Sequence, residues 1–227
     1  MKKILAIGGA VTKTAWNELK QVCEEGLIES LIHNGGSIFH DFQRATEKIS
    51  EECDSIKISE KVLSHSYPLD DLLNDYECNR PASDLVWKWI KTGIAPEGSV
   101  TDICNRNGIK VYIFTVLGAD FWQLFDSRWE LFVYRTKRDF GELCGRIRSD
   151  NFHFINLGSS VIMPEVFTKA IAVCGLKYLK NFRADAVDFL PNQYRPKTRV
   201  SRFGKYYHMT HEEFLGNWLK DEKFLDE

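Results

Sequence analysis

The stretch from Asn34 to Asp41 carries the residue types best suited to chemistry. A buried-strand pattern leads into Asn34-Gly35-Gly36, and His40-Asp41 follows where a helix could begin. Adjacent glycines let the backbone take positive φ and approach a ligand closely. A histidine titrates near neutral pH, so His40 could act as a general acid or base, polarised by Asp41 or by a substrate. The same residues would also suit an ordinary strand-to-helix turn.

Two further turns of small residues follow apolar runs. Gly8-Gly9 ends the run at 4–7, and Gly158-Ser159 ends the run at 152–157. Ligands of open α/β sheets bind at the carboxyl ends of the strands, where helix N-termini hold phosphate groups. The turns therefore predict a dinucleotide site, although the sequence contains no strict G-x-G-x-x-G. The cofactor contacts predicted from the three turns are Gly8, Gly9, Asn34, Gly35, Gly36, Gly158 and Ser159.

The elements that must position these turns alternate between strands and helices. Apolar runs predict strands at 4–7, 27–32, 109–115, 152–157 and 186–190. Amphipathic segments predict helices between and after them, at 15–25, 42–49, 100–107, 130–148, 164–174 and 210–219. Repeated βαβ units form parallel sheets with right-handed crossovers. We therefore predict an α/β fold, a doubly wound, mostly parallel Rossmann-like sheet with helices on both faces.

Length and composition favour a single domain. The chain has 227 residues, of which 44% are hydrophobic and 27% charged, as in ordinary globular proteins. We predict one domain over 1–227, with an irregular excursion at about 50–84 that suits a lid or an oligomer contact. The formal net charge of −2, without a long basic run, predicts neither a nucleic-acid partner nor a membrane-surface partner.

Metal-binding and targeting signals are weak. The six cysteines are scattered and form no C-x-x-C pair, so they predict reduced thiols and a cytoplasmic location. His208 and His211 lie three residues apart next to Glu212, but no third ligand is close in sequence, and we predict no metal. The N-terminal apolar run is cut by glycines and indicates a strand, and no apolar run approaches the length of a membrane span.

Four passages resemble the deoxyhypusine synthase-like NAD-binding superfamily. The first two are LAIGGAVTK with GLIESLIHNGGSIFHDF, and GSVTDICNRNGIKVYIFTVLGADFWQLF. The others are INLGSSVIMPEVFTKAIAV and LKNFRADAVDFLPNQYRPKTRVSRFGKYYHMTHEEFLGNWL. The resemblance covers almost the whole chain, through loose motifs, and the longer N-terminal part of the family has no counterpart.

The resemblance implies NAD as cofactor and a small amine or amino acid as substrate. Members of the family oxidise an amine, and a lysine takes the resulting electrophilic imine. Lys205 matches that lysine through Phe203-Gly204-Lys205, with a plain surface lysine as the alternative. His40-Asp41 matches the end of the family's glycine motif, and Asp120 stands near its second turn as a further cofactor contact. We also expect a homo-oligomer, a dimer or a tetramer.

Departures from the family pattern keep other functions open. The segment after Gly158 lacks the family's polyamine-binding histidine, and Lys197 and Arg199 replace an acidic residue. Like-charge repulsion from this basic loop disfavours a dicationic polyamine, whereas the loop would suit a substrate with a carboxylate or phosphate group.

The sequence therefore leaves three hypotheses open. The first is NAD-dependent oxidation of an amine or amino acid, with possible transfer to an amine acceptor. The second is deamination of the ornithine cyclodeaminase type, because the passage from His33 to Asp41 is also similar to the NAD-binding domain of the archaeal enzyme. The third is a catalytically degenerate subunit that acts through protein contacts of exposed tryptophans, namely Trp87, Trp89, Trp122 and Trp129.

Overall fold

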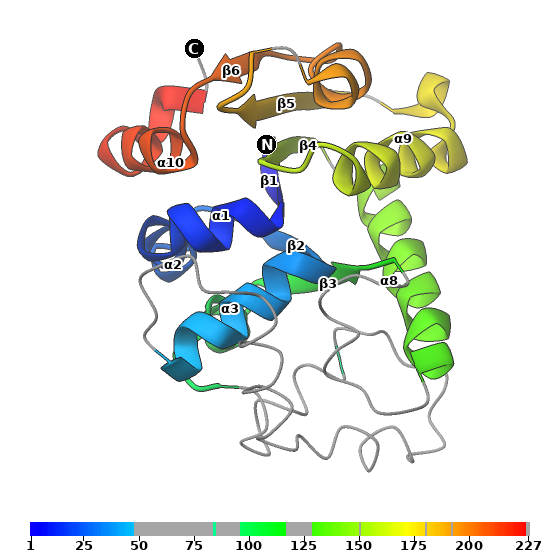
Figure 1. The fold of residues 1–227 in the computed structure, drawn as a ribbon. Coiled ribbons are helices and arrows are strands. Elements are labelled where there is room, and N and C mark those ends of the chain that lie inside the picture. Colours follow the sequence, from blue (N-terminus) through cyan, green and yellow to red (C-terminus); the bar gives the residue numbers. More distant parts are fainter. Residues whose placement is uncertain are drawn as a thin grey trace.

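The fold is known from a computed structural model, which describes most of the chain (Figure 1). The described residues are 1–47, 84, 96–116, 129–149, 151–179, 181–191 and 193–225. The excursion predicted at about 50–84 lies outside these ranges except for Asp84. Outside them as well lie the predicted cofactor contact Asp120 and three of the tryptophans assigned to an interface, Trp87, Trp89 and Trp122.

Six strands form one sheet in the order β3-β2-β1-β4-β5-β6, and every neighbouring pair is parallel. Their bounds are β1 Lys2–Ile7, β2 Ser30–Asn34, β3 Lys110–Phe114, β4 Phe152–Leu157, β5 Arg183–Asp188 and β6 Tyr206–His208. The strand order reverses between β1 and β4, as in a doubly wound sheet. The structure therefore confirms the predicted Rossmann-like α/β fold and adds one short edge strand, β6, that the sequence pattern did not predict.

Helices cover both faces of the sheet (Figure 1). The α-helices are α1 Gly9–Thr14, α2 Trp16–Glu24, α3 Gly35–Glu47, α7 Val100–Arg106, α8 Trp129–Ser149, α9 Ile162–Cys174 and α10 His211–Lys220. Short 3₁₀ turns follow at η2 Leu176–Tyr178 and η4 Glu222–Leu225, and η3 Pro196–Val200 is π-helical. No helix in the described part of the chain is long and apolar enough to cross a lipid bilayer.

The hydrophobic core has two layers, one on each face of the sheet. In β1, Leu5 and Ile7 pack into the layer beneath α1, α2 and α10, while Ile4 and Ala6 pack into the layer beneath α8 and α9. Successive strand residues point to opposite faces, so a strand covered on both sides is apolar throughout. This double burial explains why the central strands are continuous apolar runs in the sequence.

Helix caps fix where two of the helices begin. The Ser99 side chain accepts a hydrogen bond from the Asp102 backbone N–H at 3.1 Å and opens α7. Thr210 accepts one from the Glu213 N–H at 3.1 Å and opens α10, so α10 begins at His211, beside the end of the sheet. Such caps satisfy backbone donors that lack a partner in the first helical turn.

Candidate active site at the carboxyl edge of the sheet

The turn after β1 lies between the turns after β2 and β4. A Cβ placed on Gly8 would lie 2.0 Å from the Gly158 carbonyl oxygen and 3.0 Å from the Ser159 nitrogen. A Cβ placed on Gly9 would lie 3.4 Å from the Gly36 carbonyl carbon. The three glycine turns singled out in the sequence therefore come together in one cluster, and only glycine fits at position 8.

Strand register brings the turns to one level. Ile7 pairs with His33 of β2 and with Leu157 of β4, so the three strands end side by side. Gly158 has φ of +63°, a left-handed conformation that glycine adopts without strain. The cluster thus sits where the strand order reverses, which is the place where doubly wound sheets bind ligands.

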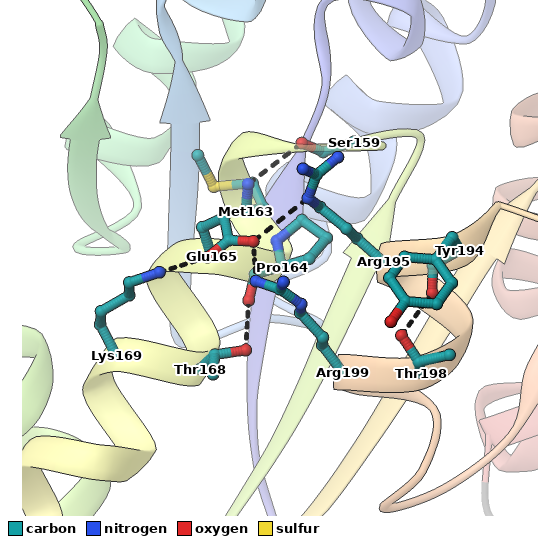
Figure 2. Close-up of polar contacts among 10 residues, drawn as sticks. All are labelled: Ser159, Met163, Pro164, Glu165, Thr168, Lys169, Tyr194, Arg195, Thr198 and Arg199. Atoms are coloured by element: carbon teal, nitrogen blue, oxygen red, sulfur yellow. Dashed lines mark hydrogen bonds and ion pairs between the residues drawn. The ribbon is translucent and has the colours of Figure 1, made fainter.

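Ser159 is committed to the fold through its side chain. Its Oγ accepts a hydrogen bond from the Met163 backbone N–H at 3.2 Å, near the start of α9 (Figure 2). Its carbonyl accepts a bond from Asn156 Nδ2 at 3.0 Å. The Oδ1 atom of Asn156 is buried and has no partner among the described residues. Ser159 therefore shapes the turn and supports the start of α9.

His40 lies beside the turns, on the second helical turn of α3. Its ring carbon Cδ2 would be 3.6 Å from a Cβ on Gly9, and its Nδ1 lies 3.0 Å from Gln43 Oε1. The side chain is half-buried. His40 is therefore the titratable predicted residue that the structure places against the glycine cluster.

Asp41 points into the fold. Its carboxylate accepts hydrogen bonds from the Val100 N–H at 2.7 Å, the Thr101 N–H at 2.9 Å and the Thr101 hydroxyl at 2.7 Å. It also accepts one from the indole Nε1 of Trp16 at 2.9 Å. Asp41 is fully buried. These bonds cap α7 and tie it to α2 and α3, so Asp41 positions helices in this structure.

His33 links Asp41 to the glycine turn after β2. Its Nδ1 lies 3.0 Å from the Ser37 hydroxyl, and its Nε2 lies 3.3 Å from the Thr101 hydroxyl. Burial lowers the pKa of His33 to about 4, against a smaller opposing effect of the Asp41 charge. The ring is therefore neutral at pH 7. Sequence reasoning did not assign His33 this role, although a histidine inside an apolar strand was a visible signal.

His211, the first residue of α10, reaches the same cluster. Its Nδ1 lies 3.1 Å from the Thr14 hydroxyl, which itself donates to the Ala10 carbonyl at 3.0 Å. Thr14 therefore accepts from His211 Nδ1–H, and the Nε2 lone pair remains as an acceptor. A Cβ on Gly158 would lie 2.5 Å from this Nε2.

The Nε2 atom of His211 is buried and has no partner among the described residues. Burial lowers the pKa of His211, while the charge of Asp188 opposes the shift. A neutral histidine with an unsatisfied acceptor beside a glycine turn fits a donor group on a ligand. The metal considered for His208 and His211 finds no support in the described residues, among which no three candidate ligands gather.

Lys205 lies away from the glycine cluster, immediately before the edge strand β6. Its side chain is exposed, and its backbone N–H donates to Asp185 Oδ1 at 2.7 Å. Its carbonyl accepts from the Ala186 N–H at 3.0 Å. Strand β5 separates β6 from β4, so the structure does not bring Lys205 to the Gly158 turn.

Asp185 is a buried hub that sequence reasoning missed. Its carboxylate contacts His153 Nε2 at 2.8 Å and Arg183 Nε at 2.9 Å, besides the N–H of Lys205. Burial alone would raise its pKa, but the hydrogen bonds from His153 and Arg183 outweigh burial and hold the pKa below its usual value. A Cβ on Gly204 would lie 2.2 Å from Asp185 Oδ1, so glycine there lets the loop approach.

Comparison with known proteins supports the fold and leaves the family open. No family model matches the sequence, and no curated relative matches it. AgrE, solved in complex with ornithine and NAD+, is similar in structure with a TM-score of 0.62 and 15% identity. That match covers 96% of this chain and 30% of the AgrE chain, so this chain spans under a third of AgrE.

Two other solved structures are similar over nearly the whole chain. A deoxyhypusine synthase candidate from Entamoeba histolytica has a TM-score of 0.63 and 10% identity, covering 99% of this chain and 76% of its own. A conserved LOR/SDH protein candidate from Methanococcus maripaludis S2 has a TM-score of 0.62 and 13% identity, covering 100% of this chain and 62% of its own. At such identities the likeness shows a shared fold.

Proposed function

We propose that the chain is an NAD-dependent enzyme acting on an amine or amino acid at the carboxyl edge of β1, β2 and β4. The observation that carries this proposal is the convergence of the glycine turns around Gly8. The turns pack so closely that a Cβ on Gly8 or Gly158 would clash, and the unsatisfied Nε2 of His211 lies beside them. Backbone turns with a free acceptor at the carboxyl edge of the sheet suit a dinucleotide. When bound, the nicotinamide ring supplies oxidation of the carbon that bears the substrate nitrogen.

Residues of the chain would bind the cofactor, transfer the proton and position the helices around the site. Gly8 and Gly158 let the turns after β1 and β4 pack together, and Gly9 leaves the backbone next to His40 free of a side chain for the cofactor. His40 lies next to Gly9 and is suited to move a proton to or from the substrate nitrogen. Asp41 positions α7 behind the site through its four hydrogen bonds.

Deamination is the second candidate, and the place of Lys205 favours it over transfer to a lysine. Transfer needs an amine acceptor close to the oxidised carbon, whereas Lys205 is exposed on the far side of β5. Deamination needs water in that role. The homo-oligomer expected from the sequence is compatible with either reaction.

Binding of NAD+ is the first test. A Cβ on Gly9 makes only ordinary contacts of 3.4 to 3.6 Å, so Gly9→Ala should fold normally while placing a methyl group beside Gly36 and His40. We expect NAD+ to raise the melting temperature of the wild-type protein by mass action. Gly9→Ala should weaken the binding of NAD+ by about tenfold or more, which corresponds to about 1.4 kcal/mol. Gly216→Ala is the matched control, because nothing lies within 4 Å of the added Cβ.

The products separate the candidate reactions. With NAD+ and L-ornithine or L-arginine, ammonia release by the Lys205→Ala variant at the wild-type rate supports deamination. Loss of all turnover in Lys205→Ala supports transfer, and His40→Gln should slow either reaction by about a hundredfold. No melting shift with millimolar NAD+ and no turnover would overturn the enzyme proposal in favour of a degenerate subunit.

A further inference from the structure

Three cations surround one carboxylate near the start of α9. Glu165 lies in the first helical turn, and Arg195 Nε is 3.2 Å from Glu165 Oε1. Arg199 and Lys169 contact the same carboxylate. Figure 2 shows the two arginines reaching from η3 and the residue before it toward α9, with Glu165 between them and Lys169. One carboxylate thus faces three positive side chains.

The cluster keeps a surplus of positive charge and of donors. A guanidinium carries five N–H donors, and only the Nε of Arg195 is paired within the described part of the chain. The Arg195 and Arg199 side chains are 43% and 33% exposed, so a ligand can reach them. An arginine pair of this kind suits the two oxygens of a carboxylate or phosphate.

The position of the cluster relates it to the candidate active site. Helix α9 begins at Ile162, three residues after Ser159 of the glycine cluster. The loop that follows β5 leads from the same edge of the sheet to Arg195. Parallel strands end at one edge of the sheet, so the segment that carries Glu165 and the segment that carries Arg195 both start at the edge where the glycine turns lie.

Exposed apolar residues follow the same two strands. Val161 after β4 and Phe189, Leu190 and Tyr194 after β5 are between 44% and 70% exposed. These exposed apolar side chains follow the strands that end at the carboxyl edge of the sheet, where ligands of such sheets bind.

The backbone of η3 has an unusual geometry. Residues Pro196–Val200 form a π-helical turn, a form that is rare and frequent at functional sites. Arg195 and Arg199 stand four residues apart across this turn and contact the same carboxylate. The Thr198 hydroxyl donates to the Tyr194 carbonyl at 2.6 Å and ties the turn to the residue before Arg195. The π-turn therefore presents both arginines to one partner.

We propose that Arg195 and Arg199 form an oxyanion subsite that receives the α-carboxylate of an amino-acid substrate. Glu165 is the internal counter-ion that holds both guanidinium groups in place while the subsite is empty. Lys169 offsets part of the Glu165 charge, which keeps the subsite attractive to a second anion. This subsite rests on the proposed function, which supplies the amino-acid substrate. A phosphate group of the cofactor has the same oxyanion chemistry, so the test must distinguish the two anions.

Calorimetric titration of the full chain tests the subsite. The probes are L-ornithine and 1,4-diaminobutane, which differ by the α-carboxylate, together with NAD+ and inorganic pyrophosphate. In Arg195→Gln/Arg199→Gln we expect L-ornithine to bind at least about tenfold more weakly, with diaminobutane and NAD+ within about twofold of wild type. Glu165→Gln removes the competing charge and should tighten L-ornithine binding, and weaker binding would contradict the counter-ion role.

The control variant also removes two arginine charges, but at the opposite edge of the sheet. Arg106→Gln/Arg148→Gln alters the last turns of α7 and α8, which precede β3 and β4, and should leave all four titrations unchanged. If Arg195→Gln/Arg199→Gln weakens the binding of NAD+ alone, the subsite belongs to a phosphate group of the cofactor. If the wild-type protein does not bind NAD+, but the Arg195/Arg199 variant still loses L-ornithine binding, the proposed function would be overturned and the subsite would stand. Unchanged binding of all four probes, or a wild type that binds none of them, would overturn the subsite.

Discussion

The two halves of the sheet treat their polar groups differently. In the N-terminal half, the chain of contacts from Ser37 through His33 and Thr101 to Asp41 turns inward and satisfies its own members. In the C-terminal half, the edge holds an unsatisfied His211 Nε2 and the cations around Glu165. The first half therefore offers mainly backbone to a ligand, whereas the second offers side chains. We infer that the glycine turns and His211 hold the cofactor, and that the arginine pair of the second half selects the substrate.

The buried carboxylates give the largest expected effect. Asp185→Asn leaves His153 and Arg183 facing a neutral group, and should lower the free energy of unfolding by about 3 to 5 kcal/mol. Asp41→Asn should cost less, about 1 to 3 kcal/mol, because the Asp41 partners are neutral donors. Urea denaturation of both variants measures the difference. Equal losses would contradict the distinction between an ionic hub in one half and a helix cap in the other.

The pH dependence of stability tests the N-terminal half. The folded pKa of His33 is about 4 and its ordinary value is 6.5, so between these values the unfolded chain binds a proton that the folded chain does not. Stability should therefore fall as the pH drops through this window, by about 3 kcal/mol in all. His33→Gln should flatten this slope in denaturant titrations at pH 7, 5.5 and 4. An unchanged slope in that variant would show that the sensitivity arises elsewhere.

The smallest expected effect concerns His211 in the C-terminal half. His211→Phe keeps a ring but loses the Nε2 acceptor, and should weaken NAD+ by about tenfold, or 1.4 kcal/mol. His211→Gln retains an acceptor and should lose less. His208→Phe is the control, because His208 is exposed and contacts the Phe189 carbonyl. Equal NAD+ affinity in all three variants would show that Nε2 meets no donor on the cofactor.

Sequence patterns predicted the frame of the molecule better than its polar contacts. Five strands and the glycine turns could be placed because apolar runs and small residues are local signals, and parallel strands must end at one edge. The strand β6 spans only Tyr206–His208 and was missed, because three residues at a sheet edge leave no apolar run.

The roles of the buried polar residues depend on partners far away in the sequence. Asp41 was predicted to polarise His40, yet it bonds Val100 and Thr101, 59 and 60 residues along the chain. Asp185 meets His153 only through the register of β4 and β5. Local patterns do not contain such pairings. The catalytic role of His40 and the acceptor role of Lys205 stay predictions until the variants above are measured.

The contact between Gly8 and Gly158 has a consequence for motion. The Gly8 N–H donates to the Leu157 carbonyl at 2.9 Å, and the Gly158 N–H donates to the Val187 carbonyl at 3.0 Å. The backbone ladder thus continues past the strand ends into the turns, and separating β1 from β4 would break it. Domain closure by a hinge between these strands is therefore a high-energy path. Adjustment to a ligand should come from η3, which lies outside this ladder, so hydrogen exchange is expected to be faster in η3 than at Gly8 and Gly158.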